Sequence, residues 1–293
     1  MELLKEIKAN EALMIEIRRH IHENPEVSGQ EFKTLEYVKE QLDSFGITYT
    51  EISYGGILAE VGDASKGKTV LLRADLDALP LQENPENLKG PKVSVSKVDG
   101  ACHACGHDGH TAMLLIAAKV LKAHEEELKG RVLFIWERSE EIGVYCKHIL
   151  RYFQRQNIKP DAVYATHLLS TYDTGKISVE PGGVMSGAMS FNIDIVGKGG
   201  HGSRPDLSRS PIDCFSAFNM GLQALRLKYI TPFDSLCISV GSLHAGAQGN
   251  IICEDGPADL DIEIRRAVFT VVYLLNKYNF SCYSIKLAFA SRQ

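Results

Sequence analysis

Residues 103–110 place three histidines, one cysteine and one aspartate within eight positions. Thiolate and imidazole are preferred zinc ligands, and imidazole combined with carboxylate also suits manganese, cobalt or nickel. Gly106 and Gly109 allow the backbone to turn between these side chains. The types and spacing of the residues therefore predict a metal site.

The start of this segment, Cys102-His103-Ala104-Cys105, has the spacing of a C-x-x-C motif. A redox pair or half of a zinc finger would share that spacing. No second C-x-x-C or H-x-x-x-H pair lies at the separation of a zinc finger. Cys105 and His107 are therefore the better pair of metal ligands, and a structural zinc or redox protein is the third reading.

Two carboxylates, Asp75 and Asp77, follow a predicted strand at 69–72 and come one loop before the histidine and cysteine segment. On its own, such a pair is more often a solvated acidic turn. Because strand ends of open α/β sheets usually carry the site, we expect both carboxylates to reach one cavity.

Glu140 and Glu141 follow the predicted strand 131–136, and His167 ends the predicted strand 161–167. Paired glutamates are usually solvated, and a lone histidine is more often a core residue. Next to a metal site, neighbouring carboxylates can divide the work, since one binds the metal and the other takes a proton from water. We expect that division here, with His167 as a further ligand.

The elements that must position these residues are read from hydrophobic spacing and from turn residues. Helices are predicted at 2–22, 30–45 and 109–123, with Gly46 as a helix C-cap. Strands are predicted at 57–61, 69–72, 131–136 and 161–167. This alternation predicts an α/β domain.

The second half changes character near Gly182. A strand is predicted at 190–196, a helix at 211–227, and strands at 236–240 and 258–264, which indicates a small α+β domain. His201 lies in the glycine-rich loop 197–202. It is either a surface histidine or a donor to a substrate carbonyl or its oxyanion.

Composition narrows the class of protein. The chain has 293 residues, 44% of them hydrophobic and 24% charged, and a net charge of −5, so we expect no nucleic-acid partner. No apolar run is long enough for a bilayer, so we expect no membrane partner. Seven cysteines without an apparent export signal predict a cytoplasmic protein.

Taken in order, these segments resemble the dinuclear-metal amidohydrolases of the aminoacylase and carboxypeptidase group. The nearest branch is that of hippurate hydrolase, N-acyl-amino-acid amidohydrolase and the auxin-conjugate (IAA-amino acid) hydrolases. The matching stretches are 18–26, 73–80, 103–111, 140–141, 166–168 and 197–201. The resemblance extends over roughly residues 10–265.

The resemblance implies metal-ligand roles for Cys105, His107, Glu141 and His167, and the role of general base and acid for Glu140. It implies two divalent ions per site, with manganese, zinc, cobalt or nickel as the candidates. The implied reaction is hydrolysis of the amide bond of an N-acyl amino acid, hippurate-like, acetylated or dipeptide-like, by metal-activated water.

Other roles follow from the same resemblance. His201 and Asn250 are expected to face the substrate from a lid, in the case of His201 across a dimer interface. Asp75, Asp77 and Asp108 are expected to support the ligands from behind.

The implied fold is an α/β catalytic domain at 1–185, with a mixed sheet and helices on both faces. A ferredoxin-like α+β lid at 186–266 is expected to form a homodimer, and 267–293 is set apart as a divergent tail.

Two departures from the family pattern carry expectations of their own. We expect the resemblance to end near Arg266, because 267–293 contains no histidine to serve as the last ligand. The chain is then shortened, with one metal held weakly, and the alternative function is an inactive remnant that only binds metal or dimerises. Trp136-Glu137-Arg138-Ser139 also replaces Phe-Gln-Pro-Ala, and we expect Arg138 to pair with Glu140 and depress its basicity.

Overall fold

The computed structural model describes residues 3–179, 186–191, 193, 195–230, 236–241, 243–246, 248–253, 269–274 and 283–287. The chain divides into two compact units. One comprises Met1–Val179 together with Ser281–Gln293, and the other comprises Glu180–Phe280.

A mixed seven-stranded sheet forms the centre of the first unit. In spatial order its strands are β1 (Tyr49–Ile52), β2 (Gly56–Gly62), β6 (Gly130–Glu137), β3 (Lys68–Asp75), β7 (Ala162–Leu168), β14 (Tyr283–Leu287) and β8 (Ile177–Ser178). Strands β6, β3, β7 and β14 are parallel, whereas β1, β2 and β8 join antiparallel. The carboxyl ends of β3, β6 and β7 therefore meet at one edge of the sheet.

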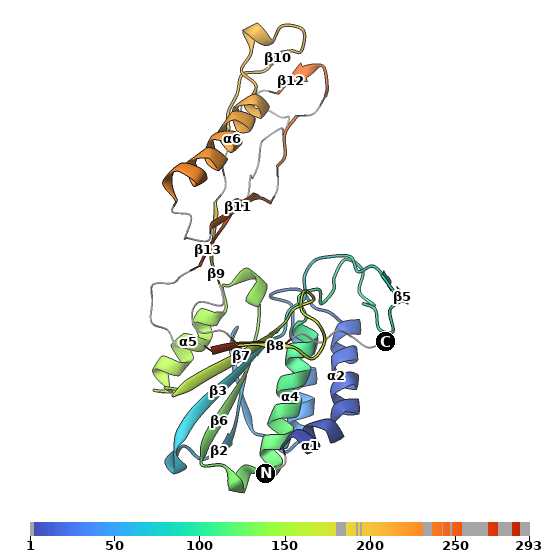
Figure 1. Cartoon of the computed structure of the whole chain (residues 1–293), viewed down its shortest axis with the longest axis vertical. Helices are drawn as coiled ribbons and strands as arrows, with labels where there is room; N and C mark the ends of the chain where they lie inside the picture. Colours follow the sequence, from blue (N-terminus) through green and yellow to red (C-terminus); the bar gives the residue numbers. More distant parts are fainter. Residues whose placement is uncertain are drawn as a thin grey trace. The chain divides into compact units, whose positions relative to one another are not determined.

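Helices cover both faces of this sheet (Figure 1). On one face lie α1 (Leu3–Ala9), α2 (Glu11–Glu23), α3 (Phe32–Ser44) and α4 (His107–Ala123), and on the other lies α5 (Cys146–Arg155). Side chains of β6 alternate between the two cores: Phe134 and Trp136 pack with the first group, and Leu133 and Ile135 pack with α5. The predicted mixed sheet with helices is confirmed.

The N-terminal helix predicted at 2–22 is wrong in one respect, because it is broken into α1 and α2 at Asn10. The side-chain Nδ2 of Asn10 donates to the carbonyl of Glu6 at 2.9 Å, and its Oδ1 accepts from Lys119 at 2.8 Å. These bonds compete with a continuous helix. The helix expected at 30–45 is α3, and Gly46 follows it with φ +67, as predicted for a C-cap.

The two glycines near the start of α4 have different roles. Gly106 has φ +85, a left-handed conformation that lets the chain turn into the helix. Gly109 instead lies inside the helix, where a Cβ atom would come within 2.4 Å of Leu168 Cδ1. The expectation that Gly109 serves a turn is therefore wrong, because it makes room for the end of β7.

Short elements connect this framework. They are the 3-10 turns η1 (Ala64–Lys66), η2 (Glu125–Glu127) and η3 (Glu140–Ile142), and the small hairpin of β4 (Glu86–Asn87) with β5 (Gly90–Pro91). Among the described residues, no helix combines the length and apolar character needed to cross a membrane.

The second unit has a three-stranded antiparallel sheet and one long helix. The sheet order is β11 (Leu236–Val240), β13 (Phe269–Leu274) and β9 (Ser186–Phe191), and the helix is α6 (Pro211–Tyr229). A second pair joins β10 (Gly200–His201) to β12 (Ile251–Ile252), and η4 (Pro205–Leu207) lies between β10 and α6. Phe215 of α6 is buried, with Ile193, Ile195 and Ile238 packed against its cluster.

The helix predicted at 211–227 and the strand predicted at 236–240 are present. The strand expected at 190–196 is displaced to β9, and the one expected at 258–264 lies outside the described residues. The segment 267–293 contributes β13 to the second unit and β14, beside β7, to the first.

Candidate metal centre

The predicted ligands come together at the carboxyl edge of the sheet. Cys105, His107 and Glu141 each offer one ligand atom, and these atoms lie within 4.8 Å of one another. Cys105 Sγ is also 3.5 Å from His167 Nε2, and His107 Nε2 is 3.7 Å from Glu141 Oε1. Bonds of about 2.0–2.3 Å to one tetrahedral ion place two ligand atoms about 3.5 Å apart. The spacing therefore suits a shared metal.

His107 gives the sharpest test of whether a cation fits. Its Nδ1 bonds Asp77 Oδ1 at 3.1 Å, whereas its Nε2 is buried without a hydrogen-bond partner among the described residues. Burial lowers the pKa of His107, but Asp77 and the Cys105 thiol outweigh burial and raise the pKa to about 11. An orphaned nitrogen in surroundings that favour positive charge fits a divalent metal.

The surroundings of the Cys105 thiol and of the His167 imidazole also fit a metal. The neighbouring His107 and His167 imidazoles lower the pKa of the Cys105 thiol, which favours the thiolate that binds metals. His167 Nδ1 lies 2.7 Å from the carbonyl of Leu168, to which only a protonated nitrogen can donate. Its Nε2 is therefore left to face Cys105.

Asp77 anchors the turn that carries the paired glutamates. Its Oδ1 accepts from the Glu140 amide at 3.2 Å and its Oδ2 from the Glu141 amide at 3.1 Å, and Ser28 Oγ donates to Oδ2 at 2.6 Å. Burial raises the pKa of Asp77, but bonds from His107, Ser28 and Glu141 lower it overall. One carboxylate thus supports the predicted ligand His107 and the predicted base Glu140 together.

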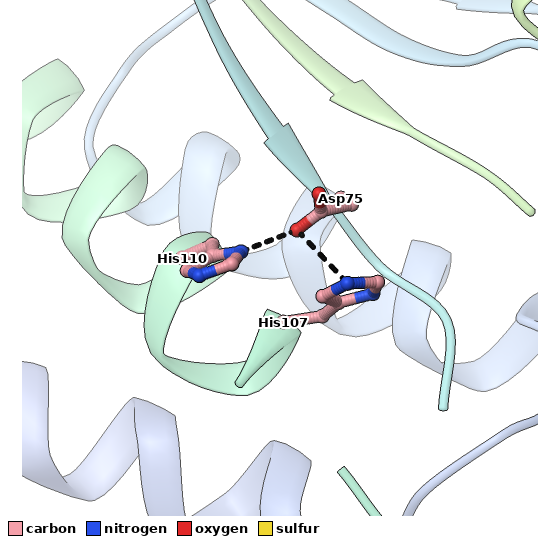
Figure 2. Close-up of side chains that lie close together, drawn as sticks. All are labelled: Asp75, His107 and His110. Atoms are coloured by element: carbon pink, nitrogen blue, oxygen red, sulfur yellow. Dashed lines mark hydrogen bonds and ion pairs between the residues drawn. The ribbon is translucent and has the colours of Figure 1, made fainter. Parts of the chain in front are cut away.

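His110 has a supporting position that the sequence did not reveal. The Leu168 amide donates to His110 Nε2 at 2.8 Å, so Nδ1 carries the proton and donates to Asp75 Oδ1 at 2.6 Å. Figure 2 shows Asp75 between His107 and His110. Asp75, His107 and His110 also lie within 4.8 Å of one another, but both nitrogens of His110 are already used. His110 therefore holds the end of β7, and its spacing of three from His107 was the available signal.

Asp75 is itself held by charge. Arg73 donates to Asp75 Oδ2 at 2.6 Å and to Glu137 Oε2 at 2.8 Å. Burial raises the pKa of Asp75, but the bond from His110 and the Arg73 guanidinium outweigh it and hold the pKa well below its usual range. Asp75 therefore stays anionic as the acceptor for His110.

Glu140 has the properties of a proton acceptor. Its Oε2 lies 3.9 Å from His107 Nε2, and burial raises its pKa, against the charge of Arg73. The expectation that Arg138 pairs with Glu140 is wrong. Arg138 is buried and bonds Glu31 Oε2 at 2.9 and 3.0 Å instead, so it does not depress the basicity of Glu140.

Asp108 lies in a different network. It accepts from Arg18 Nε at 2.8 Å and bonds His22 Nδ1 at 2.7 Å, which ties α4 to α2. Burial raises its pKa, but His22 and Arg18 lower it to about 2. His103 is also outside the ligand cluster. It lines a cavity of about 510 Å³ beside Arg18 and His22, and burial lowers its pKa to about 4.

His201 and Asn250 lie side by side in the second unit, and both are exposed. The Gly202 amide donates to the Asn250 carbonyl at 2.9 Å, next to the pairing of His201 with Ile251. The Ser203 amide donates to His201 Nδ1 at 3.2 Å, so the proton of the neutral ring is on Nε2. His201 therefore presents a hydrogen-bond donor to solvent.

Comparison with known proteins identifies the family of the chain. A profile of peptidase family M20/M25/M40 matches residues 71–287, past Arg266, where we expected the resemblance to end. The chain is 38% identical over 240 residues to IAA-amino acid hydrolase ILR1-like 5 of Arabidopsis thaliana, which covers 82% of this chain and 53% of that protein. It is 34% identical over 263 residues to N-acyl-L-amino acid amidohydrolase of Geobacillus stearothermophilus, covering 89% and 67%.

Among solved structures, the chain is similar to the YXEP protein of Bacillus subtilis, described as a dinuclear metal-binding peptidase from the M20 family. The TM-score is 0.63 at 29% identity, over 91% of this chain and 64% of that one. This chain thus spans about half to two thirds of the length of the relatives it matches. On the strength of the profile match and of these identities, the chain belongs to peptidase family M20/M25/M40.

Proposed function

We propose that this protein is a metal-dependent amidohydrolase that cleaves the amide bond of N-acyl amino acids. The observation that carries the proposal is the orphaned His107 Nε2, with carboxylate oxygens of Glu141 and Glu140 at 3.7 and 3.9 Å. The relatives named for hydrolysis of IAA-amino acids and N-acyl-L-amino acids support the same substrate class.

Cys105, His107, Glu141 and His167 would hold the metal. When bound, a divalent ion supplies the Lewis acidity that lowers the pKa of water to about 7. The named dinuclear relative supports two ions per site. The thiolate and imidazole donors favour zinc, cobalt or nickel, and the carboxylate of Glu141 also suits manganese.

Glu140 takes the proton from the attacking water and returns it to the leaving amine. Burial raises the pKa of Glu140, which makes its carboxylate a stronger base and favours uptake of a proton from water. Asp77 keeps Glu140 in place through the Glu140 backbone amide, which leaves the Glu140 carboxylate free. His201, through Nε2–H, would donate to the substrate carbonyl oxygen as negative charge develops there, and Asn250 would contact the substrate beside it.

The test is hydrolysis of N-acetyl and N-benzoyl amino acids by the purified full chain, with manganese, zinc or cobalt added and metal content measured. We expect Glu140→Gln to retain metal and to lose about 10²–10⁴-fold in kcat. Glu126→Gln, which changes an exposed glutamate, is the matched control and should leave kcat unchanged. Metal binding without turnover by the wild-type chain would refute the proposal.

We further propose that the second unit is a ferredoxin-like lid that pairs with a second copy of the chain. Its antiparallel sheet and the helix α6 support this α+β assignment. A cytoplasmic location is proposed because the six cysteines in the described part of the chain are all free thiols. Light scattering of the purified chain tests the homodimer, since a monomer at micromolar concentration would contradict it.

A further inference from the structure

The turn that carries Glu140 and Glu141 begins at a strained residue. Ser139 has φ +58 and ψ +44, a left-handed conformation that a residue with a side chain rarely adopts. Its Oγ accepts from the Gly29 amide at 2.8 Å and donates to Glu31 Oε1 at 2.7 Å. Two bonds to a distant loop therefore hold this backbone conformation.

The preceding residue, Arg138, is fixed to the same loop. Arg138 is 6% exposed and Glu31 is 0% exposed. Nε and Nη2 donate to Glu31 Oε2 at 3.0 and 2.9 Å, Nη2 also donates to the Gly29 carbonyl at 3.1 Å, and the guanidinium lies 4.9 Å from the Phe32 ring. A buried charge pair with this many partners holds one geometry.

The loop also reaches the other side of the turn. Ser28 Oγ donates to Asp77 Oδ2 at 2.6 Å, and the two oxygens of Asp77 accept from the amides of Glu140 and Glu141. The side chains of Glu140 and Glu141 are 32% and 23% exposed. Because the two carboxylates are only partly buried, the backbone of the turn determines the position from which each side chain extends.

We propose that residues 28–31, together with Arg138 and Ser139, form a clamp that positions the Glu140–Glu141 turn against the metal ligands. Arg138 and Ser139 are positioning residues in this clamp, since they act through the turn that follows them. The inference rests on the proposed function for its kinetic consequences, but the clamp itself is testable without turnover.

Two variants test the clamp in the full chain. Ser139→Gly removes the hydroxyl and keeps the backbone conformation, because glycine adopts positive φ freely. Arg138→Lys keeps the charge and loses the planar fork. The matched control is Arg131→Lys, on strand β6 that precedes Arg138, where Arg131 pairs with the more exposed Glu60 at 3.2 Å.

Three measurements are made on each protein: zinc and manganese affinity by calorimetry, hydrogen exchange of the Glu140 and Glu141 amides, and kcat and KM. We expect both clamp variants to lose about tenfold in metal affinity and in kcat, with KM nearly unchanged. The two amides should exchange faster in both variants, and Arg131→Lys should match the wild type.

Wild-type metal affinity and wild-type amide protection in both clamp variants would overturn the proposal. If Arg138→Lys fails to fold, Ser139→Gly decides by the same measurements. If the wild type binds metal but hydrolyses no substrate, the proposed function fails, while metal affinity and amide exchange still judge the clamp. If the wild type binds no metal, amide exchange alone judges it.

Discussion

The predicted site residues lie in two regions that are built in opposite ways. In the first unit Asp75, Asp77 and His107 are each 1% exposed, and their partners come from several elements of the fold. In the second unit His201 and Asn250 are exposed, and His201 is bonded to Ser203, two residues along the chain.

This difference distinguishes side chains whose positions the fold fixes from side chains that it leaves free to move. A buried carboxylate with several donors is locked in position, and removing one partner leaves a desolvated group unpaired. An exposed side chain with a local partner can adjust to a ligand without disturbing the core. Substitutions in the first region should therefore change the free energy of unfolding, and substitutions in the second should change turnover only.

We expect the largest loss in the free energy of unfolding from His110→Phe, in the first region. The variant removes the acceptor of the Leu168 amide and one of the two donors to the Asp75 carboxylate, so we expect a loss of about 3 kcal/mol in the free energy of unfolding. Urea unfolding measures this loss. The matched control is His20→Phe, which keeps the ring stack on Tyr37, and an equal loss in both variants would contradict the assigned support role.

Substitution of Asp108 should have a smaller effect on the free energy of unfolding, and this effect should depend on pH. Its pKa is about 2 in the folded chain and about 4 when unfolded, so its contribution is present above pH 4 and is lost as the pH falls toward 2. We expect Asp108→Asn to lower the free energy of unfolding by about 2 kcal/mol at pH 6, and by little near pH 2.

Urea unfolding between pH 2 and pH 6 measures the Asp108 contribution. Asp206→Asn, in the second unit, is the matched control. Arg204 also donates to Asp206, at 2.9 and 2.8 Å, but both side chains are exposed. A difference between wild type and Asp108→Asn that stays constant over this pH range would refute the assignment.

His201→Gln should have the smallest effect on folding. We expect the free energy of unfolding to stay within about 0.5 kcal/mol of wild type, because His201 is exposed and is bonded to Ser203, two residues along the chain. Turnover of an N-acyl amino acid should fall about tenfold or more, since a donor to the developing oxyanion is lost. A stability loss as large as that of His110→Phe would erase the contrast between the two regions.

The sequence predicted the parts of the site that follow from strand ends. Asp75, Glu141 and His167 were expected together because the carboxyl ends of neighbouring strands converge, and the structure places them at one edge of the sheet. Periodicity also predicted α3, α4 and strands of an α/β domain, because apolar spacing records which face of an element is buried, whereas the mixed sheet was implied by the family resemblance.

Partners across the fold could not be predicted in this way. His110 is bonded to an amide 58 positions away, and Arg138 is bonded to Glu31 at a separation of 107. Hydrophobic spacing shows that a residue is buried but not which polar group it meets. The expected Arg138–Glu140 pair was inferred from closeness in the chain, and the buried Glu31 carboxylate competed for the arginine instead.

The double attachment of Asp77 links the choice of metal to the placement of the base. Asp77 Oδ1 contacts both the His107 ring and the Glu140 amide, so a movement of the ring is transmitted to the turn. In the proposed function, ions of different radius would hold His107 at different depths, and the Glu140 backbone would shift with the ring through Asp77. Exchange of one ion for another would then change the position of the proposed base as well as the acidity of the water, and rates across a metal series should follow ionic size in addition to Lewis strength.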